Sequence, residues 1–131
     1  MMREDAHMAT KRITARLESY ERRYRELARK LADIGYIASG SVAPRYNRCG
    51  TKTCRCHADP PKLHGPYYQW TAKVNGKTIN RRLTPREAAL YNEWIANDRK
   101  ARALLSEMRD LAAKATELIL TTDPPDPPTK V

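Results

Sequence analysis

Residues 49–66 read CGTKTCRCHADPPKLHGP, and they contain all three cysteines of the chain and two of its three histidines. Four of these residues are spaced Cys-x4-Cys-x-Cys-x7-His. Structural zinc sites use four soft or borderline ligands in a tetrahedron, and three cysteines with one histidine are a standard set. The spacing therefore predicts a zinc-binding knuckle whose cofactor is Zn2+ and whose ligands are Cys49, Cys54, Cys56 and His64.

The fourth ligand has an alternative in His57. This residue adjoins Cys56, and adjacent side chains rarely converge on one metal, so the geometry favours His64. The competing interpretation is a set of unrelated thiols near a surface histidine. Gly50 is expected to allow a tight turn after the first ligand, and Gly65-Pro66 is expected to redirect the chain after the last one.

The number and clustering of the cysteines also indicate the cellular compartment of the protein. Three is an odd number, so disulfides would leave one thiol over, and clustering within eight residues favours a metal in a reducing environment. No run approaches the roughly 18 apolar residues of a membrane span. The first residues are charged rather than apolar, unlike a signal peptide. We therefore expect a cytoplasmic protein without membrane association.

Downstream of the cysteines, Asn75-Gly76 is the strongest short signal for a β-hairpin with a two-residue turn. This turn fixes the register, and the flanking residues then alternate between two faces. The apolar face is predicted to carry Tyr68, Trp70, Ala72, Val74, Ile79 and Leu83. The polar face is predicted to carry Gln69, Thr71, Lys73, Thr78, Asn80 and Arg82. Arg81 is the exception on the apolar face, where a cation–π contact with Trp70 is expected.

Residues 1–35 have the pattern of a long helix. Apolar residues recur at intervals of four and three, which is a heptad pattern. They are Ile13, Leu17, Tyr20, Tyr24, Leu27, Leu31 and Ile34. Thr10 is a candidate cap at the start of this helix, and Gly35 is a candidate left-handed residue at its end.

Residues 84–120 have a similar pattern. Thr84-Pro85-Arg86-Glu87 combines a capping residue, a proline at the first helical position and a glutamate at the third, which is a strong helix start. The apolar positions that follow are Leu90, Trp94, Ala101, Leu104, Met108, Leu111, Ala115 and Leu118, with Asn97 as a polar interruption. Residues 121–131 are rich in proline and are predicted to be a disordered tail.

Together these elements predict an α+β protein, mostly α, in which two long heptad-patterned helices flank a small zinc knuckle with a β-hairpin. The segments are an N-terminal helix at 1–35, the knuckle and hairpin at 36–83, a C-terminal helix at 84–120 and the tail at 121–131. One helix is net basic and the other net acidic, so they suit antiparallel pairing. Pairing within one chain and a homodimer through the helices both satisfy the pattern.

Positive charge is concentrated in the middle third of the chain. Residues 40–86 contain ten Lys or Arg and a single acid, Asp59, so nearly all of the net charge of +10 lies there. Such a local field indicates a polyanionic partner, most simply a nucleic acid. The competing interpretation is a solvated surface that only keeps the protein soluble.

Candidate nucleic-acid contacts lie both in the knuckle and on the hairpin. The basic candidates are Arg45, Arg48, Lys52, Arg55, Lys73, Lys77 and Arg82. They are expected to contact mainly phosphates, whereas Gln69 and Asn80 are expected to reach base edges. A two-stranded ribbon can enter the major groove of DNA. We therefore predict a nucleic-acid-binding accessory protein, with DNA favoured over RNA.

The same residues argue against catalysis. Four protein ligands close the zinc coordination sphere, whereas a catalytic zinc keeps an open position and usually a nearby carboxylate. Asp59 is the sole acid within residues 40–86, and no histidine beyond the ligand set is placed to activate a cysteine nucleophile. A non-enzymatic protein is therefore expected.

Three blocks of the sequence resemble an uncharacterised prokaryotic family of small proteins. They are RYNRCG at residues 45–50, CRC at 54–56 and HGPYY at 64–68. The resemblance covers about residues 40–85 and includes the Asn-Gly-Lys hairpin. This family is a domain of unknown function that is often found beside transposases and other mobile-element genes. The resemblance implies a metal site and a mobile-element setting, such as a transposon or phage, with a transposase or recombinase as a possible partner.

A second function is compatible with the same pattern. In this alternative the long helices are a coiled-coil protein–protein adaptor or part of a larger assembly, and the zinc is a structural staple. The two functions can also coexist, with dimerisation through the helices and DNA binding through the knuckle. Retention on duplex DNA across a salt titration distinguishes them.

Overall fold

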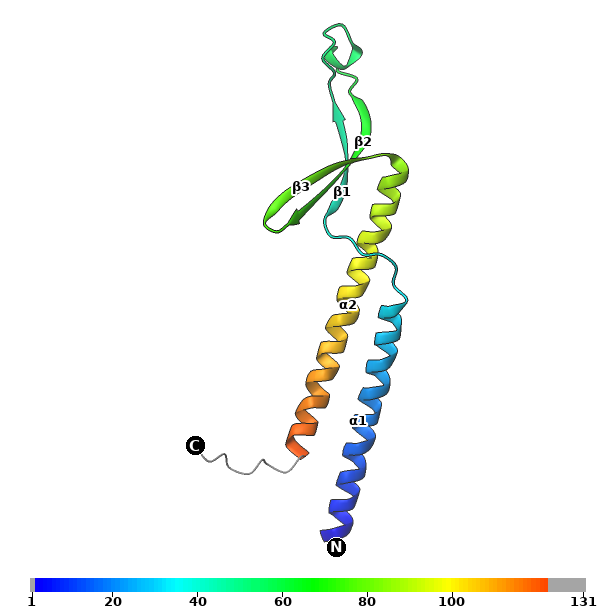
Figure 1. Ribbon diagram of the computed structural model, residues 1–131, viewed down its shortest axis with the longest axis vertical. Coiled ribbons are helices and arrows are strands. Elements are labelled where there is room, and N and C mark those ends of the chain that lie inside the picture. The colour runs from blue at the N-terminus through cyan, green and yellow to red at the C-terminus, as the bar shows by residue number, and fades with distance from the viewer. Residues whose placement is uncertain (1, 123–131) are drawn as a thin grey trace, which may run out of the picture. The chain divides into compact units, whose positions relative to one another are not determined.

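The computed structural model of the chain describes residues 2–122, and Figure 1 shows the order of the elements. They are α1 (Met2–Ala32), β1 (Ser41–Asn47), the 3-10 helix η1 (Arg55–His57), β2 (His64–Val74), β3 (Lys77–Leu83) and α2 (Pro85–Thr122). Two long helices flank a small antiparallel sheet, which confirms the predicted fold class. The predicted Pro-rich tail lies outside the described residues from position 123 onward.

The chain divides into two compact units. One comprises Met1–Asp33 and Ala101–Val131, and the other comprises Ile34–Lys100. The first is called the helical unit below, and the second is called the sheet unit. Because α2 contributes to both, its early turns are described with the sheet and its later turns with α1. None of the helices in residues 2–122 combines the length and the apolar character that a membrane crossing requires.

The helical unit pairs α1 with the later turns of α2, which lie side by side in Figure 1. On α1 every position of the predicted heptad pattern is at least partly buried, and Leu27 is only 1% exposed. From Ala101 onward the predicted positions of α2 are likewise partly buried. Arg23 forms an ion pair with Glu107 at 3.3 Å. The helices therefore pack within one chain, and removal of their apolar side chains from water is the main stabilising force.

The boundaries of α1 differ from those predicted. The helix begins at Met2, so Thr10 is not its cap but lies inside it, where its carbonyl oxygen accepts a hydrogen bond from Thr14 Oγ1 at 3.0 Å. The helix ends at Ala32, and Gly35 is not among the residues with positive φ. The prediction of a left-handed cap at Gly35 is therefore wrong. A Cβ at Gly35 would lie 3.3 Å from the Asn97 side chain, so close approach explains this glycine better.

The sheet unit is built on three antiparallel strands in the order β1-β2-β3. The hairpin between β2 and β3 has the predicted register, with Val74 opposite Lys77. Its turn residues Asn75 and Gly76 have φ angles of 52° and 78°, as a type I′ turn requires. The hairpin was therefore predictable from its two turn residues.

The strand β1 is an addition to the predicted hairpin, and it pairs with β2 along the opposite edge from β3. Arg45 lies opposite Tyr67, whereas Asn47 lies opposite His64, so a bulge separates the two pairs. β1 contains Pro44, which cannot donate to the ladder and is tolerated because β1 is an edge strand.

The apolar core of the sheet unit lies between one face of the sheet and the first turns of α2. Its buried residues are Ala72, Leu83, Ala88 and Ile95. The Tyr91 ring contacts Trp70 and Trp94, with centroids 5.0 and 5.1 Å apart. Leu90 is 37% exposed, so the predicted heptad position is wrong here. The reason is that these turns of α2 pack against a sheet, which buries a different stripe from the one facing a single helix.

Hydrogen bonds fix both the start of α2 and the connection that precedes β1. Thr84 Oγ1 accepts a hydrogen bond from the Glu87 N–H at 3.2 Å, and Glu87 Oε1 accepts one from the Thr84 N–H at 3.1 Å. This is the predicted capping box. Asn97 interrupts the apolar pattern because its side-chain amide donates to the Tyr36 carbonyl oxygen at 2.9 Å.

Candidate metal centre and open face of the sheet

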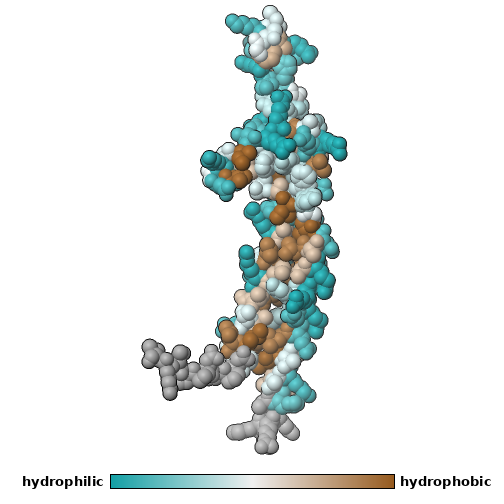
Figure 2. Space-filling view, in the orientation of Figure 1, coloured by the Kyte–Doolittle hydropathy of each residue, from teal (hydrophilic) through white to brown (hydrophobic). Residues whose placement is uncertain are grey.

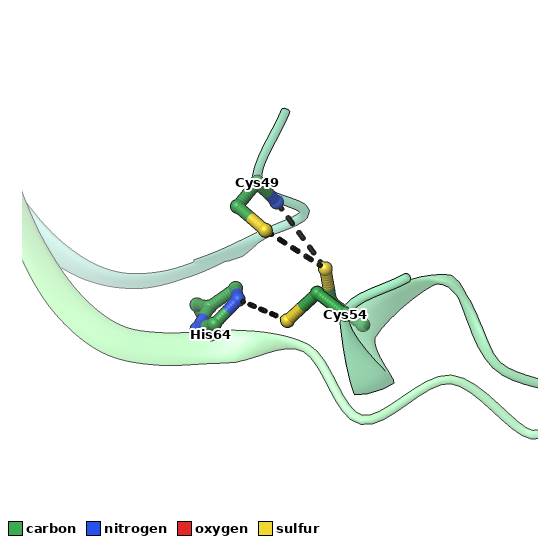
Figure 3. Close-up of side chains that lie close together, drawn as sticks. Cys49, Cys54 and His64 are labelled. Carbon is green, nitrogen blue, oxygen red and sulfur yellow. Dashed lines mark hydrogen bonds between the residues drawn. The ribbon is translucent and has the colours of Figure 1, made fainter. Parts of the chain in front are cut away.

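The three cysteines and His64 lie together at the ends of β1 and β2. Figure 3 shows Cys49, Cys54 and His64 of this cluster. Cys49 follows β1, Cys54 and Cys56 flank Arg55 at the short helix η1, and His64 is the first residue of β2. Their potential ligand atoms all lie within 4.8 Å of one another. The structure thus brings together the four predicted ligands, and this cluster could hold a metal ion.

Two of the separations between these atoms are close to the edge length of a tetrahedral metal site. The Sγ atoms of Cys49 and Cys56 are 3.6 Å apart, and Cys54 Sγ lies 3.2 Å from Nε2 of His64. Bonds of about 2.0–2.3 Å to a central ion give ligand-to-ligand edges of roughly 3.3–3.8 Å. Cys56 is fully buried, whereas the other ligands are partly or fully exposed. The donor chemistry and the separations are therefore both suited to a tetrahedral ion.

Backbone hydrogen bonds shape the knuckle, which we define as residues 49–64. The Cys54 N–H donates to the Thr51 carbonyl oxygen at 3.0 Å, and the Lys62 N–H donates to the Arg55 carbonyl oxygen at 3.1 Å. The Cys49 N–H donates to Cys56 Sγ at 3.3 Å. Donation to a sulfur favours its thiolate form and partly offsets the effect of burial at Cys56.

Electrostatics within the cluster favour the thiolate form at Cys49 and Cys54, whereas His64 binds a metal only as a neutral imidazole. A backbone hydrogen bond with Thr51, and then the contact with His64, lower the pKa of Cys49 to about 6. Hydrogen bonding with the Cys56 backbone lowers the pKa of Cys54. Hydrogen bonds with Cys49 and Cys54 raise the pKa of His64. Burial raises the pKa of Cys56 instead, but coordination to a cation would deprotonate such a thiol.

The alternative ligand His57 has a different partner. Its Nε2 donates to the Cys49 carbonyl oxygen at 2.7 Å, and it lies outside the group of converging ligand atoms. His57 therefore supports the backbone of one ligand, as residues beyond the coordination shell commonly do. The structure agrees with the choice of His64.

The glycine within the knuckle and the glycine that follows it play unequal roles. Gly50 has open space around its Cβ position and no positive φ, so the expected need for glycine at this turn is not borne out. Gly65 has a φ of +129°, and a Cβ there would lie 2.7 Å from the Arg45 carbonyl oxygen. It lies inside β2 rather than before the hairpin.

The sheet face opposite α2 is polar, and we call it the open face. The pairing places ten residues on it: Ser41, Ala43, Arg45, Tyr67, Gln69, Thr71, Lys73, Thr78, Asn80 and Arg82. None of these ten is an acid. The predicted contacts Arg45, Gln69, Lys73, Asn80 and Arg82 are thus brought together on one face.

The other predicted contacts lie elsewhere in the sheet unit. Arg48, Lys52 and Arg55 are exposed on or beside the knuckle. Lys77 pairs with Val74, on the face that carries Ala72, so the sheet separates it from Lys73 and the other basic residues of the open face. The strict alternation of strand side chains accounts for this difference.

The structure also replaces one predicted aromatic contact with another. Arg81 lies opposite Trp70, but its guanidinium lies 4.0 Å from the Glu87 carboxylate, and no cation–π contact with Trp70 is found within residues 2–122. Arg82 lies over the ring of Tyr67 instead, 4.3 Å from the centroid. Tyr67 is thus a candidate functional residue absent from the prediction. The alternation with Gln69 could have indicated it, had the strand been extended toward His64.

A three-stranded sheet backed by a helix, with a Cys3His cluster at one end, defines a small protein with a candidate metal-binding knuckle. The chain belongs to the DUF6788 family, a domain of unknown function, which matches residues 17–92. This match extends beyond the resemblance around the cysteines, because it includes much of α1 and the beginning of α2. Neither the curated proteins nor the solved structures yielded a match to the chain.

Proposed function

We propose that this protein is a non-enzymatic, zinc-dependent nucleic-acid-binding protein that acts on DNA. The observation that carries the proposal is the acid-free open face, which continues through β1 and β2 into a knuckle bearing further exposed basic residues. Residues 40–86 contain ten Lys or Arg and one acid, so this segment has a strongly positive electrostatic field. Such a field attracts a polyanion and supplies the sequence-independent part of binding.

Zinc is the ion that this donor set favours. Three thiolates and one imidazole select zinc over magnesium or calcium, which prefer oxygen ligands. The ligands Cys49, Cys54, Cys56 and His64 would complete a closed tetrahedral shell. A closed shell leaves no position for a reacting water, which supports a structural role for the metal and a non-enzymatic protein.

The setting proposed for this activity is a mobile element, and its basis is the sequence resemblance alone. A DNA-binding accessory protein beside a transposase or recombinase would help to hold the element's DNA. Nothing in the geometry of the sheet unit requires such a partner. The DNA-binding proposal therefore stands independently of the setting.

The salt dependence of binding tests the proposal. Affinity for duplex DNA is expected to fall steeply with salt, because each neutralised phosphate releases counterions. With about five phosphates neutralised, log K should fall with log salt at a slope near −4 to −5. The double variant Arg48→Ala/Arg55→Ala should flatten this slope by roughly two units, as measured by fluorescence anisotropy between low and physiological salt.

A matched control removes the same charge from another part of the chain. Arg12 and Arg16 are exposed on α1, in the helical unit. The variant Arg12→Ala/Arg16→Ala should leave the slope unchanged if the sheet unit makes the contacts. Zinc content and helicity should be the same in both variants. A wild-type protein that binds neither duplexes nor single strands at low salt would refute DNA binding.

A groove in the helical unit favours the second candidate function, association through the helices. The groove has a volume of about 590 Å³ and is lined mainly by apolar residues of α1 and α2. Figure 2 shows apolar residues gathered along the helices. The apolar lining of the groove includes Leu17, Tyr20, Tyr24, Leu111, Ala115 and Ile119.

We propose a second copy of this chain as the occupant of the groove. Its rim carries Glu18 and Glu21 beside Arg22, so a copy related by two-fold symmetry can place opposite charges against each other. Two helical hairpins would then form a four-helix bundle, in which the half-exposed heptad positions become buried. This association is compatible with DNA binding by the sheet unit.

A pair of adjacent substitutions tests the dimer. Ile119 lines the groove and is 41% exposed, whereas Leu120 does not line it and is 72% exposed. Ile119→Glu is expected to convert a dimer into a monomer at micromolar concentration, because it places a charge in the apolar interface. Leu120→Glu should remain dimeric. Light scattering measures both, and a wild-type protein that is monomeric at high concentration excludes the dimer.

A further inference from the structure

The two arginines of the open face are held in place by their neighbours. The guanidinium of Arg82 lies over the Tyr67 ring at 4.3 Å, which restricts the plane of the guanidinium. The Nε of Arg45 donates to Gln69 Oε1 at 3.2 Å. That bond leaves the terminal Nη groups of Arg45 available for a ligand. Both side chains are exposed, so their remaining donors can reach a partner.

The amides of the open face use their acceptors internally. Gln69 Oε1 accepts the hydrogen bond from Arg45, and Asn80 Oδ1 accepts one from Thr71 Oγ1 at 2.9 Å. The NH2 groups of both amides remain as donors. With two arginines, Lys73 and no acid, the open face therefore presents mainly hydrogen-bond donors.

Such a face complements one base edge better than the others. In the major groove, guanine presents two acceptors, N7 and O6, and an arginine can donate to both at once. Adenine presents one acceptor beside a donor, and cytosine presents a donor. Each of these base donors would face a donor of the open face and lack an acceptor. A donor-rich face with two restrained arginines is thus suited to guanine.

The separation of the two strands that carry Arg45 and Arg82 is smaller than the width of the major groove of B-form DNA. Arg45 and Arg82 lie on β1 and β3, on either side of β2. With strands about 4.8 Å apart, the two arginine strands are separated by roughly 10 Å. The major groove of B-form DNA is about 12 Å wide, whereas that of A-form RNA is too narrow for side chains to read.

We propose that the open face enters the major groove of duplex DNA and that Arg45 and Arg82 each read a guanine there. This inference rests on the proposed function, because it specifies which part of the DNA the open face would bind. Gln69 and Tyr67 act as positioning residues that hold the two arginines. The exposed Arg48, Lys52 and Arg55 contact phosphates and carry little sequence information.

Replacement of guanine by 7-deazaguanine tests this reading directly. Duplexes enriched by the protein from a random pool are expected to contain guanine at two fixed positions. Substituting 7-deazaguanine at either position removes the N7 acceptor and leaves O6, so one of the two arginine hydrogen bonds is lost and binding should weaken by roughly tenfold. The same substitution at guanines outside the enriched positions should have no effect.

Two lysine variants distinguish the recognition of guanine by arginine from nonspecific electrostatic attraction to DNA. Arg82→Lys keeps the positive charge but loses the planar fork that is stacked on Tyr67, so it should weaken discrimination at one guanine while leaving the salt slope unchanged. Arg81→Lys is the matched control, because Arg81 is adjacent in sequence but lies on the opposite face of the sheet. Its discrimination should equal that of the wild type. Thermal unfolding confirms that both variants are folded.

The outcomes separate this inference from the proposed function. Tight, salt-dependent duplex binding that ignores 7-deazaguanine, or that is unaffected by Arg82→Lys, would overturn guanine reading and leave DNA binding intact. Preference for an RNA duplex or a single strand would overturn groove entry and the choice of duplex DNA, and would leave only nucleic-acid binding by this face. Absence of binding to every nucleic acid would instead defeat the proposed function itself.

Discussion

Replacement of Cys56 by serine is expected to release the metal and unfold residues 49–64, while both helices persist. Cys56 is the fully buried residue of the candidate metal cluster, and its Sγ accepts a hydrogen bond from the Cys49 N–H at 3.3 Å. Structural zinc supplies roughly 10–16 kcal/mol of apparent binding free energy in small modules, so little else can hold a knuckle of this size. The zinc content measured by elemental analysis should fall from one zinc per chain to well below one.

Amide resonances locate the loss, and the two histidines provide the comparison. In Cys56→Ser the resonances of the knuckle should collapse toward random-coil positions, whereas those of α1 should not move. His64→Ala should weaken zinc binding strongly. His57→Ala should retain the metal with at most about a hundredfold loss of affinity, the usual range for residues beyond the coordination shell. A full zinc content in Cys56→Ser, or a larger effect at His57 than at His64, would contradict the assigned ligands.

Gly40→Ala is expected to destabilise the sheet unit by roughly 2–5 kcal/mol, from backbone strain and overpacking together. Gly40 immediately precedes β1 and has a φ of +96°, a conformation that L side chains rarely adopt. An added Cβ would lie 2.3 Å from the Thr71 carbonyl oxygen and 2.8 Å from Ala72 Cβ. These neighbours belong to the central strand and the core, so the clash can be relieved only by moving β1 away from β2.

Gly50→Ala is the matched control for this prediction, because its Cβ would meet nothing within 4 Å and its φ is not positive. Chemical denaturation of the zinc-loaded protein should separate the two variants clearly, with Gly50→Ala within about 0.5 kcal/mol of the wild type, as is usual for surface substitutions. Equal stabilities for Gly40→Ala and Gly50→Ala would show that β1 is not held as described.

The features that could be predicted from the sequence are those specified by neighbouring residues. Four ligands spaced within 16 residues, the Asn75-Gly76 turn and the Thr84–Glu87 capping box each depend on local geometry, and all are present in the structure. The heptad pattern of α1 is of the same kind, because a helix repeats its own contacts every seven residues.

The features that were not predicted depend on distant partners. The strand β1 has a proline and no alternation of its own, and it becomes a strand through pairing with β2. Leu90 is exposed because the sheet covers a neighbouring stripe of α2. Lys77 lies on the face opposite Lys73, as its pairing with Val74 in the predicted register requires. The stacking of Arg82 on Tyr67 required the full length of β2.

The bulge between Arg45 and Asn47 has a consequence for how the family can change in evolution. A shift of one residue in a strand moves its side chains to the other face, so an insertion between Arg45 and Cys49 would turn Arg45 away from the open face or displace a ligand. Insertions in residues 57–63 would leave both the pairing of β1 and the ligands in place, because loop closure costs little more as a loop lengthens. Relatives should therefore differ in length after Cys56 and keep a constant spacing before Cys49.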